Sequence, residues 1–344
     1  MKIKIFALIL SLVIVSLSII ACVEIPLGPS ESMGENSGSQ VVSGSAGVSE
    51  PAESSKDEPP VSYEDSSEEP STDQSSEEPS SEPVSEGEPT YVVPEDYPYQ
   101  NIASLDSYTI KDDPLDEYFR DSVFIGNSIM VHFYNYVSAK RATYSDFLGK
   151  CKFLAASAYS PKLEFDSNPQ TQYQYMIKYQ GEYMHVWDAV QKMGAKTAYV
   201  SLMALNELGL HPNATCAEDT FDNMVRMLDK IKEVNPGINI VVLSNTYMVN
   251  TFNYKNLNNK NIYKLNSLML DYCNANNIAF LDVTTPLTVD GYLKTSYCID
   301  PDPNSGNGCH LQQKCYNSWV AVLRNYAYAM QNGGYKNIEV MPEP

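Results

Sequence analysis

The sequence predicts an α/β domain in which a mainly parallel sheet lies between two layers of helices. Apolar, β-prone runs alternate with segments whose apolar residues recur at helical spacing, from about residue 101 to the end at residue 344. Such alternation implies a parallel sheet covered on both faces, and a segment of this length can form one sizeable domain. In sheets of this kind, ligands bind at the carboxyl ends of the strands.

Each element follows from a local pattern. Strands are expected where apolar runs stop at small or polar residues, at positions 122–126, 151–156, 197–203, 238–244 and 278–282. Helices are expected where apolar residues recur every three or four positions, at 113–121, 128–140, 182–193, 218–234, 258–276 and 312–330. Pro236 and Gly237 end the fourth of these helices.

The first 22 residues have the pattern of a targeting segment. Lys2 and Lys4 precede an apolar run over residues 5–20, and the run ends in Ile-Ala-Cys at Cys22. This pattern resembles a bacterial lipobox, which implies cleavage before Cys22 and a lipid on its sulfur. The run is short for a spanning helix, which needs ~20 residues. We therefore expect residues 1–22 to be a lipoprotein signal, with the mature chain anchored on the extracellular face of a bacterial membrane. An ordinary signal peptide or a short membrane anchor is the alternative.

Residues 23–100 have the composition of a disordered linker. Ser, Glu, Pro and Gly dominate, and the segment holds 19 acidic residues and one lysine, so it carries −18 of the net charge of −20. Its self-repulsion and its prolines favour an extended tether. The remainder, residues 101–344, is near-neutral and has no basic stripe, which argues against nucleic-acid binding. We expect a monomer.

Six cysteines follow Cys22, and none lies in a Cys-x-x-Cys pair. The sequence therefore predicts no metal site and no cofactor. Outside the cell an even number of cysteines permits disulfides, and Cys298–Cys309 or Cys309–Cys315 would staple one loop. Buried free thiols are the alternative.

Three polar residues follow strands or precede the last helix. Ser128 ends the run Val-Phe-Ile-Gly-Asn-Ser and starts a helical pattern, where backbone N–H groups point at a developing oxyanion. Asn206 follows the third strand, and His310 precedes the last helix. Ester hydrolysis needs a nucleophile, a base and oxyanion donors, and these three side chains supply one of each. A serine in this position is otherwise a helix cap.

The segments 124–128, 204–207 and 307–310 resemble conserved sequence blocks of the SGNH/GDSL hydrolases, and the resemblance covers the whole domain, about residues 122–330. The resemblance implies a flavodoxin-like three-layer α/β/α sandwich. It makes Ser128 the nucleophile and an oxyanion donor through its N–H, Asn206 the oxyanion amide and His310 the base. In the block that carries the base, Asn307 stands at the position of the triad acid. The family has a further block in which a glycine N–H donates to the oxyanion. The corresponding segment here, residues 153–159, lacks a glycine, so the N–H of Ala156, or that of Ser157, would complete the oxyanion hole.

The third member of the triad is the main departure from the family pattern. The neutral amide of Asn307 can orient an imidazole but cannot stabilise an imidazolium, and the corresponding change in a serine protease lowers turnover about 10⁴-fold. Asp302 in the same loop is a candidate substitute. The sequence thus predicts a membrane-anchored serine esterase acting on an acylated small molecule or glycan. A catalytically impaired glycan-binding lipoprotein is the alternative.

The remaining candidates are histidines and aromatic residues. His132 lies one helical turn after Ser128 and could approach the site. His185 and His211 show no partner in the sequence. Several aromatic residues around the expected cleft could stack on sugar rings or simply pack over the sheet, namely Tyr159, Tyr173, Tyr175, Tyr179, Tyr183 and Trp187.

Overall fold

The computed structural model describes residues 62–63, 110–166, 176–251, 254–304 and 306–343. The predicted signal segment and Cys22 lie outside these residues, as does the predicted linker apart from Ser62 and Tyr63. The described residues all fall in one compact unit, Pro59–Pro344.

A six-stranded sheet forms the centre of the fold, and five of its strands are parallel. The order is β1-β3-β2-β6-β7-β8. The parallel strands are β2 (Ser122–Gly126), β3 (Lys152–Ala155), β6 (Thr197–Ser201), β7 (Asn239–Leu243) and β8 (Ala279–Leu281). At one edge, β1 (Ser62–Tyr63) pairs antiparallel with β3. The order of the parallel strands is that of flavodoxin-like sheets, so the predicted fold class is confirmed.

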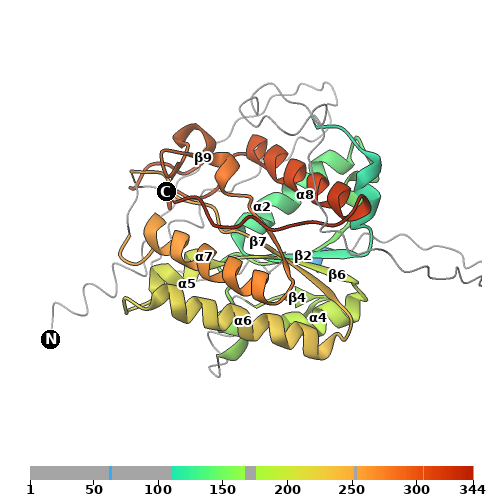
Figure 1. The fold of residues 1–344 in the computed structure, drawn as a ribbon, viewed down its shortest axis with the longest axis horizontal. Helices are drawn as coiled ribbons and strands as arrows, with labels where there is room; N and C mark the ends of the chain where they lie inside the picture. The colour runs from blue at the N-terminus through green and yellow to red at the C-terminus, as the bar shows by residue number, and fades with distance from the viewer. Residues whose placement is uncertain (1–61, 64–109, 167–175, 252–253, 305, 344) are drawn as a thin grey trace, which may run out of the picture. The chain divides into compact units, whose positions relative to one another are not determined.

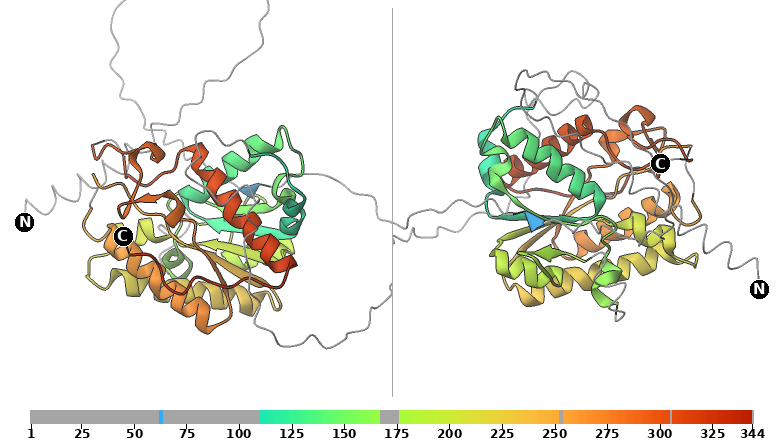
Figure 2. Two further views of the ribbon diagram at one scale, coloured as in Figure 1. Left: turned by 45° about the horizontal axis from the view of Figure 1, so that its top comes forward. Right: turned by 180° about the vertical axis from the view of Figure 1, so that it is seen from behind.

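Two layers of helices cover the sheet. In Figure 1, α2 and α8 lie on one face, and α4, α6 and α7 lie on the other; the views of Figure 2 agree. The helices are α2 (Ser128–Arg141), α4 (Val186–Met193), α5 (Ala204–Leu210), α6 (Cys216–Val234), α7 (Asn259–Ala275) and α8 (Tyr316–Gln331).

Side chains of the central strands fill the core. The rings of Phe124 and Tyr199, on neighbouring strands, stack with centroids 4.6 Å apart. Arg324 of α8 is fully buried and makes two 2.8 Å contacts with the carboxylate of Asp116. This paired guanidinium joins the last helix to the short 3-10 helix η2 (Pro114–Phe119).

The structure differs from the sequence prediction mainly in short elements. The segment predicted as a helix at 113–121 is η2, whose first residue is a proline. The helix predicted from residue 182 begins at Val186, because β5 (Glu182–Tyr183) pairs with β4 (Lys178–Tyr179) in a hairpin. Helix α5 was not predicted, since its seven residues give too short a periodic pattern. The parallel sheet places the ends of β2 and β6 side by side, with Ser128 and Asn206 just beyond them.

Candidate active site

Ser128 lies on a tight turn between β2 and α2. The strand ends at Gly126, and the side-chain oxygen of Asn127 accepts a 3.1 Å hydrogen bond from the N–H of Ile129. A Cβ atom at Gly126 would lie 2.6 Å from Cβ of Met130, so only glycine lets the helix pack this closely on the strand. Ser128 is therefore the first residue of α2, where its N–H has no acceptor within the helix.

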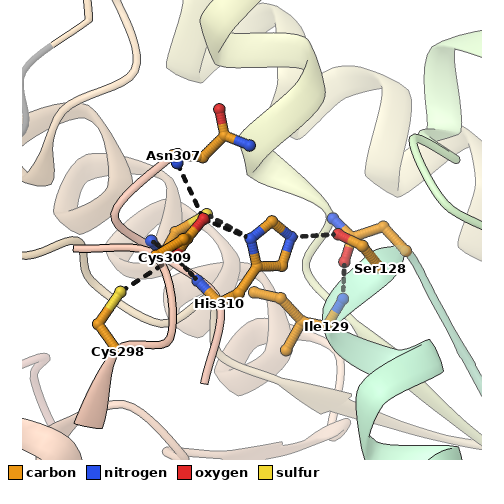
Figure 3. Close-up of polar contacts among 8 residues, drawn as sticks. Ser128, Ile129, Cys298, Asn307, Cys309 and His310 are labelled. Carbon is orange, nitrogen blue, oxygen red and sulfur yellow. Dashed lines mark hydrogen bonds and ion pairs between the residues drawn. The ribbon is translucent and has the colours of Figure 1, made fainter. Parts of the chain in front are cut away.

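His310 approaches Ser128 from a loop 182 residues further along the chain. Its Nε2 lies 3.0 Å from Oγ of Ser128. Short antiparallel pairing holds the loop, because Cys298 pairs with Leu311 and the N–H of Ile299 donates to the carbonyl of His310 at 3.0 Å. Figure 3 shows the imidazole between Ser128 on one side and the sulfur atoms of Cys298 and Cys309 on the other. The structure thus brings the predicted nucleophile and base within hydrogen-bond distance.

The acid that contacts His310 is Asp300, and the prediction of Asn307 in this role was wrong. Nδ1 of His310 lies 2.8 Å from Oδ2 of Asp300. The loop doubles back, so that Asn307 offers its backbone N–H to the same oxygen at 2.8 Å (Figure 3). Asp302, the predicted substitute, accepts hydrogen bonds from the backbone and side chain of Asn304. Sequence reasoning missed Asp300 because it stands ten residues before His310 instead of three.

Asp300 is held by a set of donors from its own loop. Oδ1 accepts the N–H of His310 at 3.1 Å and that of Cys309 at 3.3 Å, and the thiol of Cys298 donates to it at 3.1 Å. The loop closes tightly over this residue, since a Cβ atom at Gly306 would lie 2.4 Å from Cβ of Asp300. Gly306 and Gly308 on either side of Asn307 are thus the one sequence signal of a chain folding back on itself.

Burial and charge shift the protonation of these groups. Burial alone would raise the pKa of Asp300, but the hydrogen bonds and charge of His310 outweigh it and hold that pKa at about 2. Burial alone would lower the pKa of His310, but the neighbouring Cys309 sulfur and the Asp300 carboxylate raise it above its usual value. The carboxylate is therefore charged at neutral pH and stabilises an imidazolium.

His132 packs against the base but has a different protonation. Its ring centroid lies 5.2 Å from that of His310. Desolvation, followed by the charge of His310, lowers the pKa of His132 to about 4. At neutral pH His132 is uncharged, so it packs beside the base as a neutral ring.

The residues predicted to hold the oxyanion lie in α5 and in the chain that follows β3. Asn206 lies in the first turn of α5, and its amide donates to the carbonyl of Tyr159 at 3.4 Å, a long hydrogen bond. The N–H of Ala156 donates to the carbonyl of Gly126 at 3.3 Å. This contact continues the parallel pairing of β3 with β2, so the prediction of Ala156 as an oxyanion donor differs from the structure.

The turn after Ala156 keeps the backbone shape of a glycine turn without a glycine. The N–H of Tyr159 donates to the carbonyl of Ala156 at 3.2 Å, and Ala158 at the third position has φ 61°. A positive φ in this position favours glycine. Ser157, at the second position of the turn, is exposed, and its N–H is the alternative that the sequence left open.

Glu207 contacts the chain that follows the turn at residues 156–159. It is buried, and its carboxylate accepts the N–H of Lys162 at 2.5 Å. Desolvation raises the pKa of Glu207, against the effect of this hydrogen bond. The residue that follows Asn206 therefore ties α5 to the chain beyond β3.

The two remaining histidines have acidic partners away from Ser128. Nδ1 of His185 lies 2.8 Å from the buried carboxylate of Glu164, and Nε2 of His211 lies 3.0 Å from Asp219. The hydrogen bond to Glu164 raises the pKa of His185. We assign both pairs to the packing of their loops.

Most of the described aromatic residues that were candidates for sugar stacking are buried in the protein. Tyr159, Tyr179 and Trp187 are buried, whereas Tyr183 is exposed. Tyr173 and Tyr175 lie outside the described residues. The described residues thus favour packing over sugar stacking for three of the four.

The six cysteines after Cys22 are buried free thiols in the structure. Neither disulfide pairing considered from the sequence is present. Two of these thiols, Cys298 and Cys309, lie beside Asp300 and His310.

The linked Ser128, His310 and Asp300 have the arrangement of a Ser-His-Asp triad, and the chain is similar in fold to several solved structures. One is a GDSL-like lipase from Bacteroides thetaiotaomicron, with 16% identity, a TM-score of 0.44 and coverage of 67% of this chain and 98% of that one. Another is a proposed acylhydrolase from Bacteroides fragilis, with 14% identity, a TM-score of 0.43 and coverage of 67% and 94%. The periplasmic domain of a Salmonella lipopolysaccharide acetyltransferase matches at 12% identity and a TM-score of 0.39, with coverage of 58% and 82%.

No protein-family model matches the chain, and no curated protein matches it either. Identities and TM-scores of this size say nothing about chemistry, which rests on the geometry of this chain's own side chains. Among the helices that the structure describes, none has the length and apolar composition needed to cross a membrane.

Proposed function

We propose that this chain is a serine ester hydrolase of the SGNH/GDSL type. The observation that carries the proposal is the unbroken contact from Ser128 to His310 at 3.0 Å and from His310 to Asp300 at 2.8 Å. In this mechanism His310 accepts the proton of Ser128 as Oγ attacks the acyl carbon. The charged Asp300 stabilises the imidazolium, and His310 then protonates the leaving alcohol.

Two groups support the tetrahedral intermediate in this proposal. The N–H of Ser128 lies at the start of α2, and Asn206 lies in the first turn of α5, which follows the neighbouring strand β6. Donors that are already fixed in place stabilise the oxyanion without reorganising. Water in place of the alcohol then releases the acid from the acyl-enzyme.

The substrate we propose is an O-acyl group on a cell-wall or dietary glycan. The lipobox-like segment ending at Cys22 and the acidic linker support a location at the extracellular face of the cell membrane, where the chain would meet such polymers. A smaller acylated molecule in the same location is compatible with the same chemistry. Labelling cells with a palmitate analogue, with a Cys22→Ala control, tests the anchor.

The purified chain is tested on p-nitrophenyl acetate and on O-acetylated glycans, with acetate release as the readout. We expect turnover that Ser128→Ala abolishes, together with labelling of Ser128 by a fluorophosphonate probe. A wild-type rate equal to that of Ser128→Ala, with no label on Ser128, would reject the enzyme. Activity on p-nitrophenyl acetate without acetate release from any glycan would reject only the substrate class.

The impaired glycan-binding alternative rested on Asn307 at the position of the triad acid, on Ala204 and on the glycine-free segment after β3. The carboxylate of Asp300 at Nδ1 of His310 supports the enzyme over that alternative. The glycan-binding protein therefore stays as an outcome of the test above and is not a second proposal.

A further inference from the structure

The base His310 and two neighbouring side chains form a mixed cluster of possible metal ligands, on the side of the imidazole ring away from Ser128. Within the described part of the chain, Asp300, Cys309 and His310 form a group whose ligand atoms all lie within 4.8 Å of one another. The cluster consists of a thiol, a carboxylate oxygen and an imidazole nitrogen. We propose that this cluster binds a thiophilic divalent cation such as Zn²⁺, and that the bound ion switches off the esterase reversibly. The regulatory part of this inference rests on the function proposed above.

The distances suit a tetrahedral ion. Sγ of Cys309 lies 3.9 Å from Nδ1 of His310, and Nδ1 lies 2.8 Å from Oδ2 of Asp300. Zinc binds sulfur at ~2.3 Å, nitrogen at ~2.0–2.1 Å and carboxylate oxygen at ~2.0–2.2 Å, which places tetrahedral ligand atoms roughly 3.3–3.6 Å apart. Small movements of the carboxylate and of the thiol therefore convert the observed cluster into a metal-binding one.

The surroundings hold the ligands in place. The carboxylate of Asp300 is fixed by the backbone N–H groups of Asn307, Cys309 and His310, which do not depend on a proton at Nδ1. The thiol of Cys298 contacts the other carboxylate oxygen at 3.1 Å. Such outer contacts orient ligating groups and raise metal affinity. The side chains of Asp300 and His310 are 17% and 19% exposed, so the cluster is open to solvent on their side.

The chemistry of the ring explains the inhibition. In the active form Nδ1 carries the proton that contacts Asp300, and Nε2 has the lone pair that accepts the proton of Ser128. A cation at Nδ1 displaces that proton to Nε2, and the thiol of Cys309 loses its proton to solvent as the sulfur–metal bond forms. Nε2 is then a hydrogen-bond donor toward Ser128, so it cannot act as the base. Removal of the ion restores the first tautomer.

The ligand set also predicts which ions act. One sulfur and one imidazole favour Zn²⁺ and related ions, whereas Mg²⁺ and Ca²⁺ prefer sites made only of oxygen. Mg²⁺ is therefore the control cation. Cys309→Ser is the control variant, because it removes the sulfur ligand and keeps the backbone N–H that holds Asp300.

The first measurement is the esterase rate of the reduced full chain during a Zn²⁺ titration, with the metal-catalysed background subtracted. We expect more than tenfold inhibition of the wild type, full recovery with a chelator, and no inhibition by Mg²⁺. Each rate is normalised to the rate of the same variant in the presence of a chelator, and Cys309→Ser should need at least tenfold more Zn²⁺ than the wild type for the same fractional inhibition. A Cys273→Ala variant, which loses a thiol on α7, should behave as the wild type. Equal inhibition of Cys309→Ser and wild type would overturn the proposal.

The second measurement reads the site without any substrate. Co²⁺ bound to a thiolate gives a charge-transfer absorption band. We expect this band to saturate at one Co²⁺ per wild-type chain and to be absent in Cys309→Ser. Absence of the band, together with absence of tightly bound Zn²⁺ in equilibrium dialysis, would overturn the metal site. A Cys309-dependent band in a protein without esterase activity would instead reject the proposed function and leave the metal site standing.

Discussion

The two sides of Ser128 are built in different ways. On the base side, Asp300 and His310 form a continuous chain of short contacts, and each carboxylate oxygen has at least two donors. On the oxyanion side, the Asn206 amide makes a long 3.4 Å contact, and the N–H of Ala156 already donates to Gly126.

The difference shows that the base side depends on the charge of Asp300, whereas the proposed oxyanion side depends on hydrogen-bond donors that are still available to a substrate. A partly buried carboxylate that keeps its charge needs several hydrogen bonds, so the base side is fully paired before substrate arrives. An oxyanion hole needs donors that are not yet fully used, so its contacts are longer or absent until the reaction proceeds. The comparison predicts large effects from charge removal and smaller effects from donor removal.

The largest effect is expected from Asp300→Asn. Loss of the carboxylate leaves the imidazolium unstabilised, and kcat should fall by about 10⁴-fold, as in other Ser-His-Asp enzymes. Asn307→Ala is the matched control. It keeps the backbone N–H that contacts Asp300, so its kcat should stay within about twofold of the wild type. Steady-state kinetics of both variants check this, and the reverse order of effects would restore Asn307 as the residue that orients the base.

A smaller loss is expected from Asn206→Ala. Removal of one oxyanion donor lowers kcat by about 10²–10³-fold in other hydrolases, with KM little changed. The thermal unfolding midpoint should stay close to that of the wild type, because the contact of the amide with Tyr159 in the described part of the chain is a long one. A large drop in this midpoint would mean that Asn206 acts as a brace of its loop and not as a donor.

The pH profile tests the charge on the base side. The pKa of His310 is raised, and only the neutral ring accepts the proton of Ser128, so activity is lost as pH falls. The groups that face this ring are Asp300, Cys309 and His132. We expect the acid limb of kcat/KM, measured with a chelator present, to lie above pH 6.5 with about a tenfold change per pH unit below it. A limb at or below the ordinary histidine value would contradict the raised pKa.

The smallest effect is expected from Ala158→Gly on the oxyanion side. Relief of the positive φ at this position should stabilise the fold by about 1 kcal/mol. Ala155→Gly, in the buried strand β3, is the control and should destabilise it. Chemical denaturation of the two variants measures both changes, and destabilisation by Ala158→Gly would show that the alanine methyl group packs usefully in this turn.

Much of the fold could be predicted from the sequence because its signals are local. The five parallel strands lie within two residues of the predicted ranges, since each is a short apolar run with a clear end. The hairpin of β4 and β5 and the short helix α5 were missed, because two-residue strands and a seven-residue helix carry almost no periodic signal.

The sequence by itself determined the α/β fold, the position of Ser128 at the end of β2, and the loop from which His310 reaches it. Motifs of this kind are read from neighbouring residues, and Gly126 is required by a contact only four residues away. Only the tertiary structure decided that Asp300 replaces Asn307 beside the base and that the N–H of Ala156 donates to the carbonyl of Gly126. Both depend on the path of the chain after a turn. That path is stabilised by contacts between residues that are not neighbours in the sequence, and a local sequence pattern does not predict them.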